Sequence, residues 1–338
     1  MASIPFTWEL LDSTFIIDVR SEIEFEKGHI PGAVNVPILN TEERKIVGIT
    51  FKKLGQQHAV LKGLELSGPN LSKRLKLAVK LSKNNQNIVV YCWRGGMRSS
   101  FFTFLMEFYG INVSVIKGGY KSYRKQVLKS FESTYNFSIL GGMTGSAKTT
   151  ILHELDKINA FSIDLEGLAN HRGSSFGALG MAKQPSQEQF ENNLSHCLIK
   201  VGKQKCWVED ESRTVGATII PEGIWNQMRK APHYFLDKPF DIRLDQIMLD
   251  YGIFSKEELQ SCMERISKRL GPQNTKNAIS LLQSEQFREA FSIALTYYDK
   301  AYAYHREINP LGKKIQISCN ATNNAEIAQH LFKLTNGE

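Results

Sequence analysis

Two α/β units in tandem are the fold that the sequence predicts. Short apolar runs typical of buried strands alternate with helical stretches, which favours parallel sheets. In the first unit we expect strands at 14–20, 88–92 and 113–116, and helices that include 71–82 and 98–109. A second series starts at 137–142, where an apolar strand enters a glycine-rich turn followed by a helix from near Lys148. The length of 338 residues suits about two domains.

The second unit should contain further strands and a helical insert. Strands are expected at 160–164, 206–209 and 315–319. Residues 240–306 carry apolar side chains at helical spacing with few strand signals. We therefore expect one domain at 1–125, a helical connector at 126–136, and a second domain at 137–338 that contains the helical segment of about 240–306.

Composition and charge limit the class of protein. The formal charge of +8 favours a polyanionic partner. The five cysteines are scattered, without a CxxC pair or a Cys/His cluster at zinc spacing, so we expect neither a zinc site nor a disulfide scaffold. No apolar run reaches the roughly 18 residues of a membrane span, and the N-terminus lacks the pattern of a signal peptide. We expect a cytoplasmic protein without a membrane partner.

A reactive thiol is predicted where a buried strand ends at Cys92. Ligands bind at the carboxyl ends of parallel strands, and Gly95 and Gly96 let the backbone curl into an anion-binding nest. Arg94, Arg98 and the start of a helix near Arg98 add positive potential. Because such a field stabilises a thiolate, the candidate catalytic residues are Cys92, Arg94, Gly95, Gly96 and Arg98.

The surroundings of this loop resemble rhodanese domains. The resemblance rests on the runs 17–21, 25–37 and 117–120 together with the Cys92 loop, and it covers roughly 5–125. It implies a rhodanese-like fold in which the cysteine carries sulfur as a persulfide. The spacing Cys-x5-Arg is one residue longer than in common single-domain rhodaneses, and rhodanese-like phosphatases and arsenate reductases share it. Sulfur transfer, selenium transfer and phosphate chemistry all stay open at this loop.

The glycine-rich turn after the strand at 137–142 has the pattern of a P-loop. It matches G-x-x-x-x-G-K-[ST] at Gly142, Lys148 and Thr149, and has Ala147 where the pattern has glycine. The methyl group of Ala147 should not block the loop as long as this residue keeps a helical φ. The predicted phosphate- or diphosphate-binding residues are Gly142, Thr144, Gly145, Ser146, Lys148 and Thr149. We expect a P-loop NTPase-like α/β domain, with a magnesium ion at Thr149 as one option.

An acidic group follows the predicted strand at 206–209. Glu209, Asp210 and Glu211, with Arg213 beside them, stand where a nucleotide-hydrolysing P-loop protein places an acidic metal ligand. Nothing else in the sequence marks an ATPase. The loop therefore suits the diphosphate of a substrate as well as ATP.

A rhodanese-like domain directly before a P-loop domain resembles the tRNA 2-selenouridine synthases over nearly the full length. The runs 91–99, 164–177 and 207–213 carry this resemblance together with the P-loop. It implies a tRNA with 2-thiouridine at the wobble position of its anticodon stem-loop as substrate. In this family geranyl diphosphate first alkylates the sulfur, and selenium from selenophosphate then displaces the S-geranyl group.

The same resemblance implies roles for particular residues. Cys92 would carry selenium, the P-loop would hold a diphosphate or selenophosphate, and His171 and Arg172 would form a substrate-binding loop. No tightly bound cofactor is implied, and a selenophosphate-supplying enzyme is an expected partner. Basic and aromatic residues of the helical segment, such as Arg243 and Tyr302, could face tRNA, although aromatic residues at helical spacing more often form core.

Two other classes of function stay open. One is a rhodanese-like sulfurtransferase, or a Cys-x5-Arg phosphatase or arsenate reductase, joined to a nucleotide-binding domain. The other is a non-enzymatic P-loop scaffold that binds RNA while the rhodanese-like domain docks a sulfur-relay partner.

Overall fold

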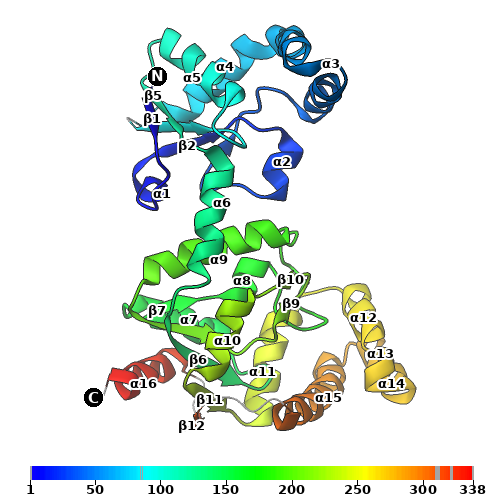
Figure 1. Ribbon diagram of the computed structural model, residues 1–338. Coiled ribbons are helices and arrows are strands. Elements are labelled where there is room, and N and C mark those ends of the chain that lie inside the picture. Colours follow the sequence, from blue (N-terminus) through cyan, green and yellow to red (C-terminus); the bar gives the residue numbers. More distant parts are fainter. Residues whose placement is uncertain (1, 84, 86, 309–312, 320–322, 337–338) are drawn as a thin grey trace. The chain divides into compact units, whose positions relative to one another are not determined.

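The chain folds into two α/β units. The computed structural model describes residues 2–83, 85, 87–308, 313–319 and 323–336, without the side chains of 303–308 and 336. Unit 1 comprises Met1–Ser130 and Glu188–Ile199, and unit 2 comprises Phe131–Gln187 and Lys200–Glu338 (Figure 1). Each unit contains a five-stranded sheet in which all neighbouring strands are parallel, so the predicted α/β class is confirmed.

The sheet of unit 1 has the strand order β1-β5-β4-β2-β3. Its strands are β1 Ala2–Ile4, β2 Phe15–Asp18, β3 Val34–Asn35, β4 Ile88–Tyr91 and β5 Val113–Ile116. β4 lies at the centre and is buried along its whole length, which agrees with its continuous apolar run. The three strands predicted for this unit are confirmed as β2, β4 and β5. The edge strands β1 and β3 were missed because two or three residues show too little pattern.

The helices of unit 1 include one long element that the sequence patterns do not indicate. They are α1 Leu10–Ser13, α2 Glu22–Lys27, α3 Thr41–Ser67, the 3-10 turn Gly68–Asn70, α4 Leu71–Ser82, α5 Met97–Phe108 and α6 Gly119–Ser130. α4 and α5 confirm the helices predicted at 71–82 and 98–109. α3 buries only Ala59 and Ser67, so it has no apolar stripe to reveal it, and Gly55 (φ +83°) marks a kink within it.

The sheet of unit 2 has the strand order β12-β11-β6-β8-β7. Its strands are β6 Asn136–Gly142, β7 Phe161–Ile163, β8 Lys205–Glu209, β11 His233–Asp237 and β12 Lys314–Ser318, and a separate antiparallel pair is formed by β9 Thr214–Val215 and β10 Thr218–Ile219. The four strands predicted here are confirmed as β6, β7, β8 and β12. β11 was missed because its ends are polar. Since the strands are parallel, Gly142 and Glu209 end neighbouring strands at the same edge of the sheet.

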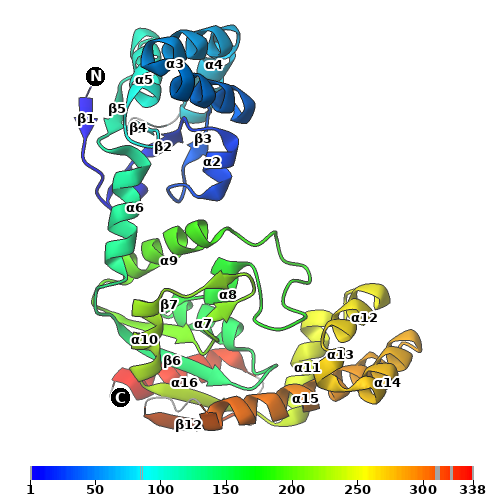
Figure 2. The ribbon, with the colours of Figure 1, turned by 45° about the vertical axis from the view of Figure 1, so that its right-hand side comes forward.

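The helices of unit 2 fall into two groups. They are α7 Lys148–Lys157, α8 Leu165–Ala169, α10 Glu222–Lys230, α11 Phe240–Tyr251, α12 Lys256–Arg265, α13 Ser267–Leu270, α14 Pro272–Gln283, α15 Phe287–Ile308 and α16 Asn324–Asn336. The remaining helix, α9 Gln187–Val201, crosses the boundary between the two units. α7 and α16 pack on the sheet through residues such as Leu152 and Leu331. α11 to α15 surround a core of their own that includes Leu259, Leu282 and Phe291, and Figure 2 shows them grouped to one side of the sheet.

Most of α9 belongs to unit 1 rather than to the unit in which its neighbours in sequence lie. The Glu188–Ile199 part of α9 packs against α6, where Tyr120 Oη donates to Glu188 Oε1 at 2.9 Å and Arg124 pairs with Glu191 at 2.5 Å. The predicted domain boundary placed all residues after 136 in the second domain, whereas Glu188–Ile199 belongs to unit 1. Sequence composition does not reveal a segment that packs against an earlier domain. No helix in the described part of the chain is both long and apolar enough to cross a membrane.

Candidate active sites

Glycines fix the loop that carries Cys92 after β4. Tyr120 N, at the start of α6, donates to Cys92 O at 2.9 Å. Gly119 has φ +56°, and a Cβ at this position would clash with Cys92 O. Gly95 has φ +64°, and a Cβ there would clash with Ile116 O. Only glycine suits either position, so the cysteine loop and the loop before α6 form one packed unit.

The Cys92 thiol is buried and surrounded by hydrogen-bond donors. Its Sγ accepts from Gly96 N at 3.3 Å and lies 3.2 Å from Ser99 Oγ, while only 4% of the residue is exposed. Burial raises the pKa of the thiol. Hydrogen bonds from Ser99 and Gly96 and the charge of Arg98 outweigh burial, so the pKa of Cys92 lies below its ordinary value. The site therefore favours a nucleophilic thiolate.

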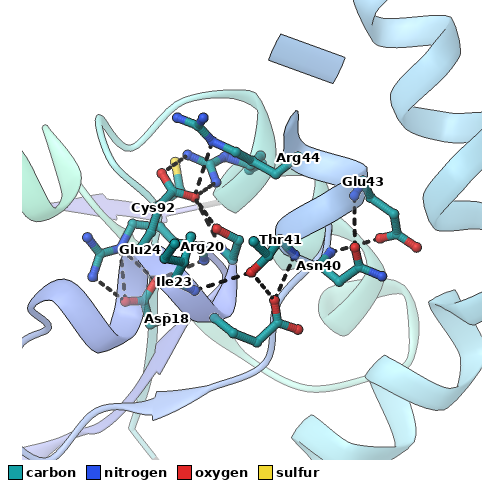
Figure 3. A network of polar contacts seen from close by, with 12 residues as sticks. Asp18, Arg20, Ile23, Glu24, Asn40, Thr41, Glu43, Arg44 and Cys92 are labelled. Atoms are coloured by element: carbon teal, nitrogen blue, oxygen red, sulfur yellow. Dashed lines mark hydrogen bonds and ion pairs between the residues drawn. The ribbon is translucent and has the colours of Figure 1, made fainter. Parts of the chain in front are cut away.

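The guanidinium of Arg98 is paired with a carboxylate beside the cysteine. Its Nη1 lies 2.7 Å from Glu24 Oε2 and its Nη2 lies 3.2 Å from Glu24 Oε1. Arg44 Nε lies 3.7 Å from the same carboxylate, within the network of Figure 3. Burial raises the pKa of Glu24, but the hydrogen bond and charge of Arg98 outweigh it and hold this pKa at about 2. Glu24 therefore stays ionised and offsets much of the charge of Arg98.

Four of the five predicted catalytic residues lie in the loop around the sulfur or directly beside it, whereas Arg94 is exposed to solvent. Two further residues were missed. Ser99 was missed because it lies in the first turn of the predicted helix. Its hydroxyl follows the N-cap Gly96 by three residues, and this spacing could have indicated that it faces the cysteine loop. Glu24 takes part in a capping box with Ser21, and nothing in the sequence linked it to the cysteine.

The P-loop of unit 2 joins β6 to α7. Lys148 begins α7, and its Nζ donates to Gly142 O at 3.3 Å, so the ammonium group lies over the loop. Ser146 is 1% exposed, and its hydroxyl donates to Met143 O at 2.5 Å. The side chain of Ser146 thus shapes the loop, while Lys148 supplies the charge for an anion.

Ala147 adopts a left-handed conformation, with φ +61° and ψ +36° at the N-cap of α7. Tolerance of the methyl group was predicted on the condition of a helical φ, and the residue does not meet this condition. The P-loop pattern has glycine at this position because a left-handed residue with a Cβ costs roughly 1–2 kcal/mol. The loop keeps its shape in spite of the methyl group, so strain is stored directly before Lys148.

Arg243 of α11 ties the helical segment to the P-loop. It is only 3% exposed, and its Nη1 donates to Thr144 O at 3.1 Å. Its two terminal nitrogens also pair with the carboxylate of Asp299, on α15, at 2.8 and 2.7 Å. Gly145 (φ +80°) packs so closely that a Cβ would clash with Arg243 O. Arg243, one of the cations that could have faced tRNA, is instead buried against the P-loop.

Carboxyl groups gather beside the P-loop. Glu209 is fully buried; its Oε1 accepts from Glu166 N at 2.8 Å, and its Oε2 has no partner among the described residues. Burial, and then neighbouring acidic groups, raise the pKa of Glu209 well above its ordinary value. Burial and the charge of Glu166 raise the pKa of Glu211 to about 8, against the opposing charge of Lys148. Thr149 Oγ1 donates to Glu166 Oε2 at 3.1 Å, so this hydroxyl faces the acidic group.

Asp210 lies between these two glutamates in sequence but in a different environment. Tyr302 Oη donates to its Oδ2 at 2.9 Å. His233 Nε2 lies 2.9 Å from the same oxygen, as an ion-pair contact rather than an aligned hydrogen bond. Burial raises the pKa of Asp210, but His233, Tyr302 and Lys148 outweigh it and lower this pKa. Tyr302 thus supports the site from inside unit 2, and nothing in the sequence had linked His233 to it.

The loop after α8 lies against the acidic group. Gly173 has φ +63°, and a Cβ there would clash with Glu211 Oε2. The guanidinium of Arg172 lies 5.5 Å from the centre of the Tyr251 ring. Its Nη1, like His171 Nδ1, is buried without a hydrogen-bond partner among the described residues. His171 and Arg172 therefore lie on a loop that borders the acidic group beside the P-loop. Each has a buried nitrogen that is left for a hydrogen bond to a substrate.

Two other predictions concern Arg213 and magnesium. Arg213 is exposed and its guanidinium lies 3.9 Å from Glu222, so the structure does not bring it to the P-loop. Within the described ranges, no group of three or more His, Cys, Asp or Glu side chains is arranged to hold a metal ion. Magnesium at Thr149 stays a prediction.

Known proteins resemble both units. Residues 7–126 match the rhodanese-like domain, and residues 135–335 match the family described as tRNA 2-selenouridine synthase AAA domain. A tRNA 2-selenouridine synthase of Pseudomonas entomophila is 34% identical, with 89% of this chain and 90% of that protein covered. Those of Pseudomonas putida and Pseudomonas syringae pv. tomato are 35% and 34% identical, with 88% of this chain and 89% and 90% of theirs covered. The chain therefore belongs to the tRNA 2-selenouridine synthase family.

Proposed function

We propose that the protein converts 2-thiouridine in tRNA to 2-selenouridine, the reaction for which its relatives are named. Similarity that spans both units supports the tRNA substrate and the selenium-containing product. The observation that carries the proposal is the pair of reactive loops in one chain. One loop holds a thiol with a lowered pKa, and the other places a lysine over a P-loop.

The P-loop is proposed to hold the diphosphate of geranyl diphosphate. Lys148 supplies positive charge, and backbone N–H groups at the start of α7 point toward an anion. The raised pKa of Glu211, about 8, leaves this carboxyl largely neutral at pH 7, so it repels a diphosphate less than an ordinary carboxylate would. In the alkylation, the tRNA sulfur bonds to C1 of the geranyl group. The C1–O bond breaks, its electron pair leaves with the diphosphate, and N3 of the base loses its proton.

Cys92 is proposed to carry the selenium that replaces the S-geranyl group. The thiolate is the form of cysteine that accepts a chalcogen atom, and the hydrogen bonds from Gly96 and Ser99 favour that form. Selenophosphate supplies selenium at the selenide level, so loading of Cys92 needs a two-electron acceptor, for which we propose a mixed disulfide between Cys92 and a small thiol. The Se–P bond breaks with phosphate as product, the S–Se bond forms at Cys92, and the small thiol leaves. In the exchange a C2–Se bond forms at the base, the C2–S bond breaks, and geranylthiolate leaves with its electron pair. The small thiol then attacks the Cys92 sulfur, the S–Se bond breaks, N3 of the base regains a proton, and the mixed disulfide is restored.

The pairing of Arg98 favours chalcogen transfer over phosphate chemistry. In a Cys-x5-Arg phosphatase or arsenate reductase, the arginine has to bind the oxygens of a tetrahedral anion. Here two guanidinium nitrogens of Arg98 are engaged by Glu24, whose pKa of about 2 keeps it ionised at any physiological pH. A phosphate or arsenate bound at this loop would have to compete with the Glu24 carboxylate for the guanidinium of Arg98, which disfavours phosphate chemistry.

The test uses the full chain with tRNA that carries 2-thiouridine, geranyl diphosphate and selenophosphate, followed by mass spectrometry of the nucleosides. The expected product is 2-selenouridine. Omission of geranyl diphosphate should stop the conversion, and Cys92→Ser should leave S-geranyl-2-thiouridine. Absence of 2-selenouridine would contradict the proposal, and release of phosphate from a phosphoester, lost in Cys92→Ser, would favour the phosphatase instead.

A further inference from the structure

A helical segment of unit 1 holds most of the net charge of the chain. Residues 41–83 contain ten lysines and arginines against three glutamates, a net charge of +7 in a chain whose formal charge is +8. The segment consists of α3, the following 3-10 turn and α4, between β3 and β4 (Figure 2). The rest of the chain is close to neutral, so the attraction of a polyanion is concentrated on these helices.

The lysines of α4 share one face of the helix. Lys73, Lys76 and Lys80 are spaced by three and four residues, are all exposed, and have no ion-pair partner in the part of the chain that the structure describes. Neighbours at this spacing lie about 5–6 Å apart, and the row extends about 10 Å along the helix. Arg74 behaves differently, because it is half-buried and pairs with Glu43 at 2.8 Å.

α3 extends the same kind of surface toward the cysteine loop. Lys45, Lys52 and Lys53 are exposed and likewise lack an ion-pair partner within the described residues. Figures 1 and 2 both show α3 and α4 next to one another. Arg44, directly before Lys45, reaches the Glu24 carboxylate that also binds Arg98, close to Cys92. The basic surface thus begins beside the reactive thiol.

The chemistry of this surface favours the backbone of a nucleic acid. Six unpaired lysines repel one another, and bound phosphates relieve that repulsion. Lysine is a compact point charge that contacts phosphates and positions a nucleic acid without reading its bases. Large apolar side chains of α3 and α4 are also exposed, namely Ile46, Ile49, Phe51, Leu54, Val60, Leu61, Leu64, Leu77 and Leu81. They would suit an acidic protein, but apolar contacts alone do not relieve the mutual repulsion of the lysines, whereas a row of phosphates does.

We propose that the surface formed by Lys45, Lys52, Lys53, Lys73, Lys76 and Lys80 docks the phosphate backbone of the substrate tRNA beside Cys92. The inference rests on the proposed function, which supplies tRNA as the substrate. It assigns tRNA contacts to the helices between β3 and β4. In the segment 240–306, which the sequence offered as another candidate, Arg243 is engaged within unit 2, whereas Arg265, Lys268 and Arg269 are exposed.

The test compares two matched pairs of substitutions. Lys76→Gln with Lys80→Gln removes two charges four residues apart on α4. Lys125→Gln with Lys129→Gln removes two charges at the same spacing on α6, which are also exposed and without an ion-pair partner among the described residues. The affinity for 2-thiouridine tRNA is measured at several salt concentrations, with the melting temperature of each variant as a check of folding.

The α4 pair should weaken tRNA binding about tenfold near 0.1 M salt and lower the salt slope by about two, while the α6 pair changes affinity less than about threefold. In turnover, the α4 pair should raise KM for tRNA and leave kcat unchanged. If the α4 pair keeps the wild-type affinity for tRNA and the wild-type salt slope, the inference is overturned, and an acidic protein becomes the better candidate partner of this surface. Failure of the wild-type protein to bind tRNA would contradict the proposed function itself.

Discussion

The two reactive loops occupy the same kind of position, after a strand of a parallel sheet, but they control charge in opposite ways. In unit 1, hydrogen bonds lower the pKa of Cys92, and Glu24 offsets the charge of Arg98. In unit 2, burial raises the pKa of Glu211 to about 8 beside Lys148. The first environment stabilises a negative nucleophile, whereas the second suppresses the negative charge of the protein where an anion is to bind. One strand-end geometry thus serves two different chemistries.

The loops also differ in how they form tight backbone turns. The cysteine loop has glycine at its left-handed positions, Gly95 and Gly119, and so contains no Cβ strain there. The P-loop places Ala147 in the left-handed region and stores strain. The comparison predicts that substitutions should affect one loop and leave the other unchanged.

The largest expected effect is that of Cys92→Ser on the cysteine loop alone. Formation of 2-selenouridine should fall at least about 10³-fold, because a hydroxyl cannot carry selenium at neutral pH. The affinities for tRNA and for geranyl diphosphate should stay within a few fold of wild type. Nucleoside mass spectrometry and calorimetry measure the two properties, and a large loss of diphosphate binding would show that the loops are not independent.

The converse substitution is Lys148→Ala. Loss of a charge-assisted contact should weaken binding of geranyl diphosphate about 10- to 100-fold by calorimetry. The rate at which iodoacetamide alkylates Cys92 should not change, and Lys148→Arg should recover part of the affinity. Equal affinity of the wild type and Lys148→Ala for geranyl diphosphate would show that the diphosphate does not bind at the P-loop.

The pH dependence of diphosphate binding should separate the loops further. Glu211 is protonated below about pH 8 in the folded protein, so affinity should fall several-fold as the pH rises through 8 and the carboxylate forms beside Lys148. Between the ordinary pKa of 4.5 and about 8 the folded state binds more protons, so the free energy of unfolding should also fall as the pH rises through this window. Glu211→Gln should flatten both profiles, and an unchanged slope in this variant would assign the titration elsewhere.

The smallest expected effect is that of Ala147→Gly. It relieves left-handed strain of roughly 1–2 kcal/mol but adds chain entropy to the unfolded state, so we expect a net gain of at most about 1 kcal/mol. Thermal unfolding measures this gain. A loss of stability would mean that the methyl group makes contacts worth more than the strain.

Features that are continuous in the sequence could be predicted. Cys92 and Lys148 each follow a buried apolar strand and a glycine-rich turn, so local pattern was enough to locate both loops. The helix at 71–82 was predicted with its bounds because its apolar residues repeat at helical spacing. α3 was missed for the opposite reason, since most of its surface is exposed.

Features that join distant parts of the chain could not be predicted. Arg243 reaches the P-loop and Asp299 only once the helical segment has folded, and His233 approaches Asp210 only across neighbouring strands. The left-handed φ of Ala147 could not be predicted from the residue type, because the folded turn imposes it. Tertiary geometry decided each of these cases.

Selenium bound to Cys92 is the species on which the proposed reaction depends. Intact-protein mass spectrometry after incubation with selenophosphate and a small-molecule disulfide, without tRNA, can detect it. The wild-type protein should gain one selenium atom that maps to Cys92 and is lost on treatment with excess thiol, and Cys92→Ser should gain none. Formation of 2-selenouridine by a protein that holds no selenium at Cys92 at any stage of turnover would contradict the proposed carrier role.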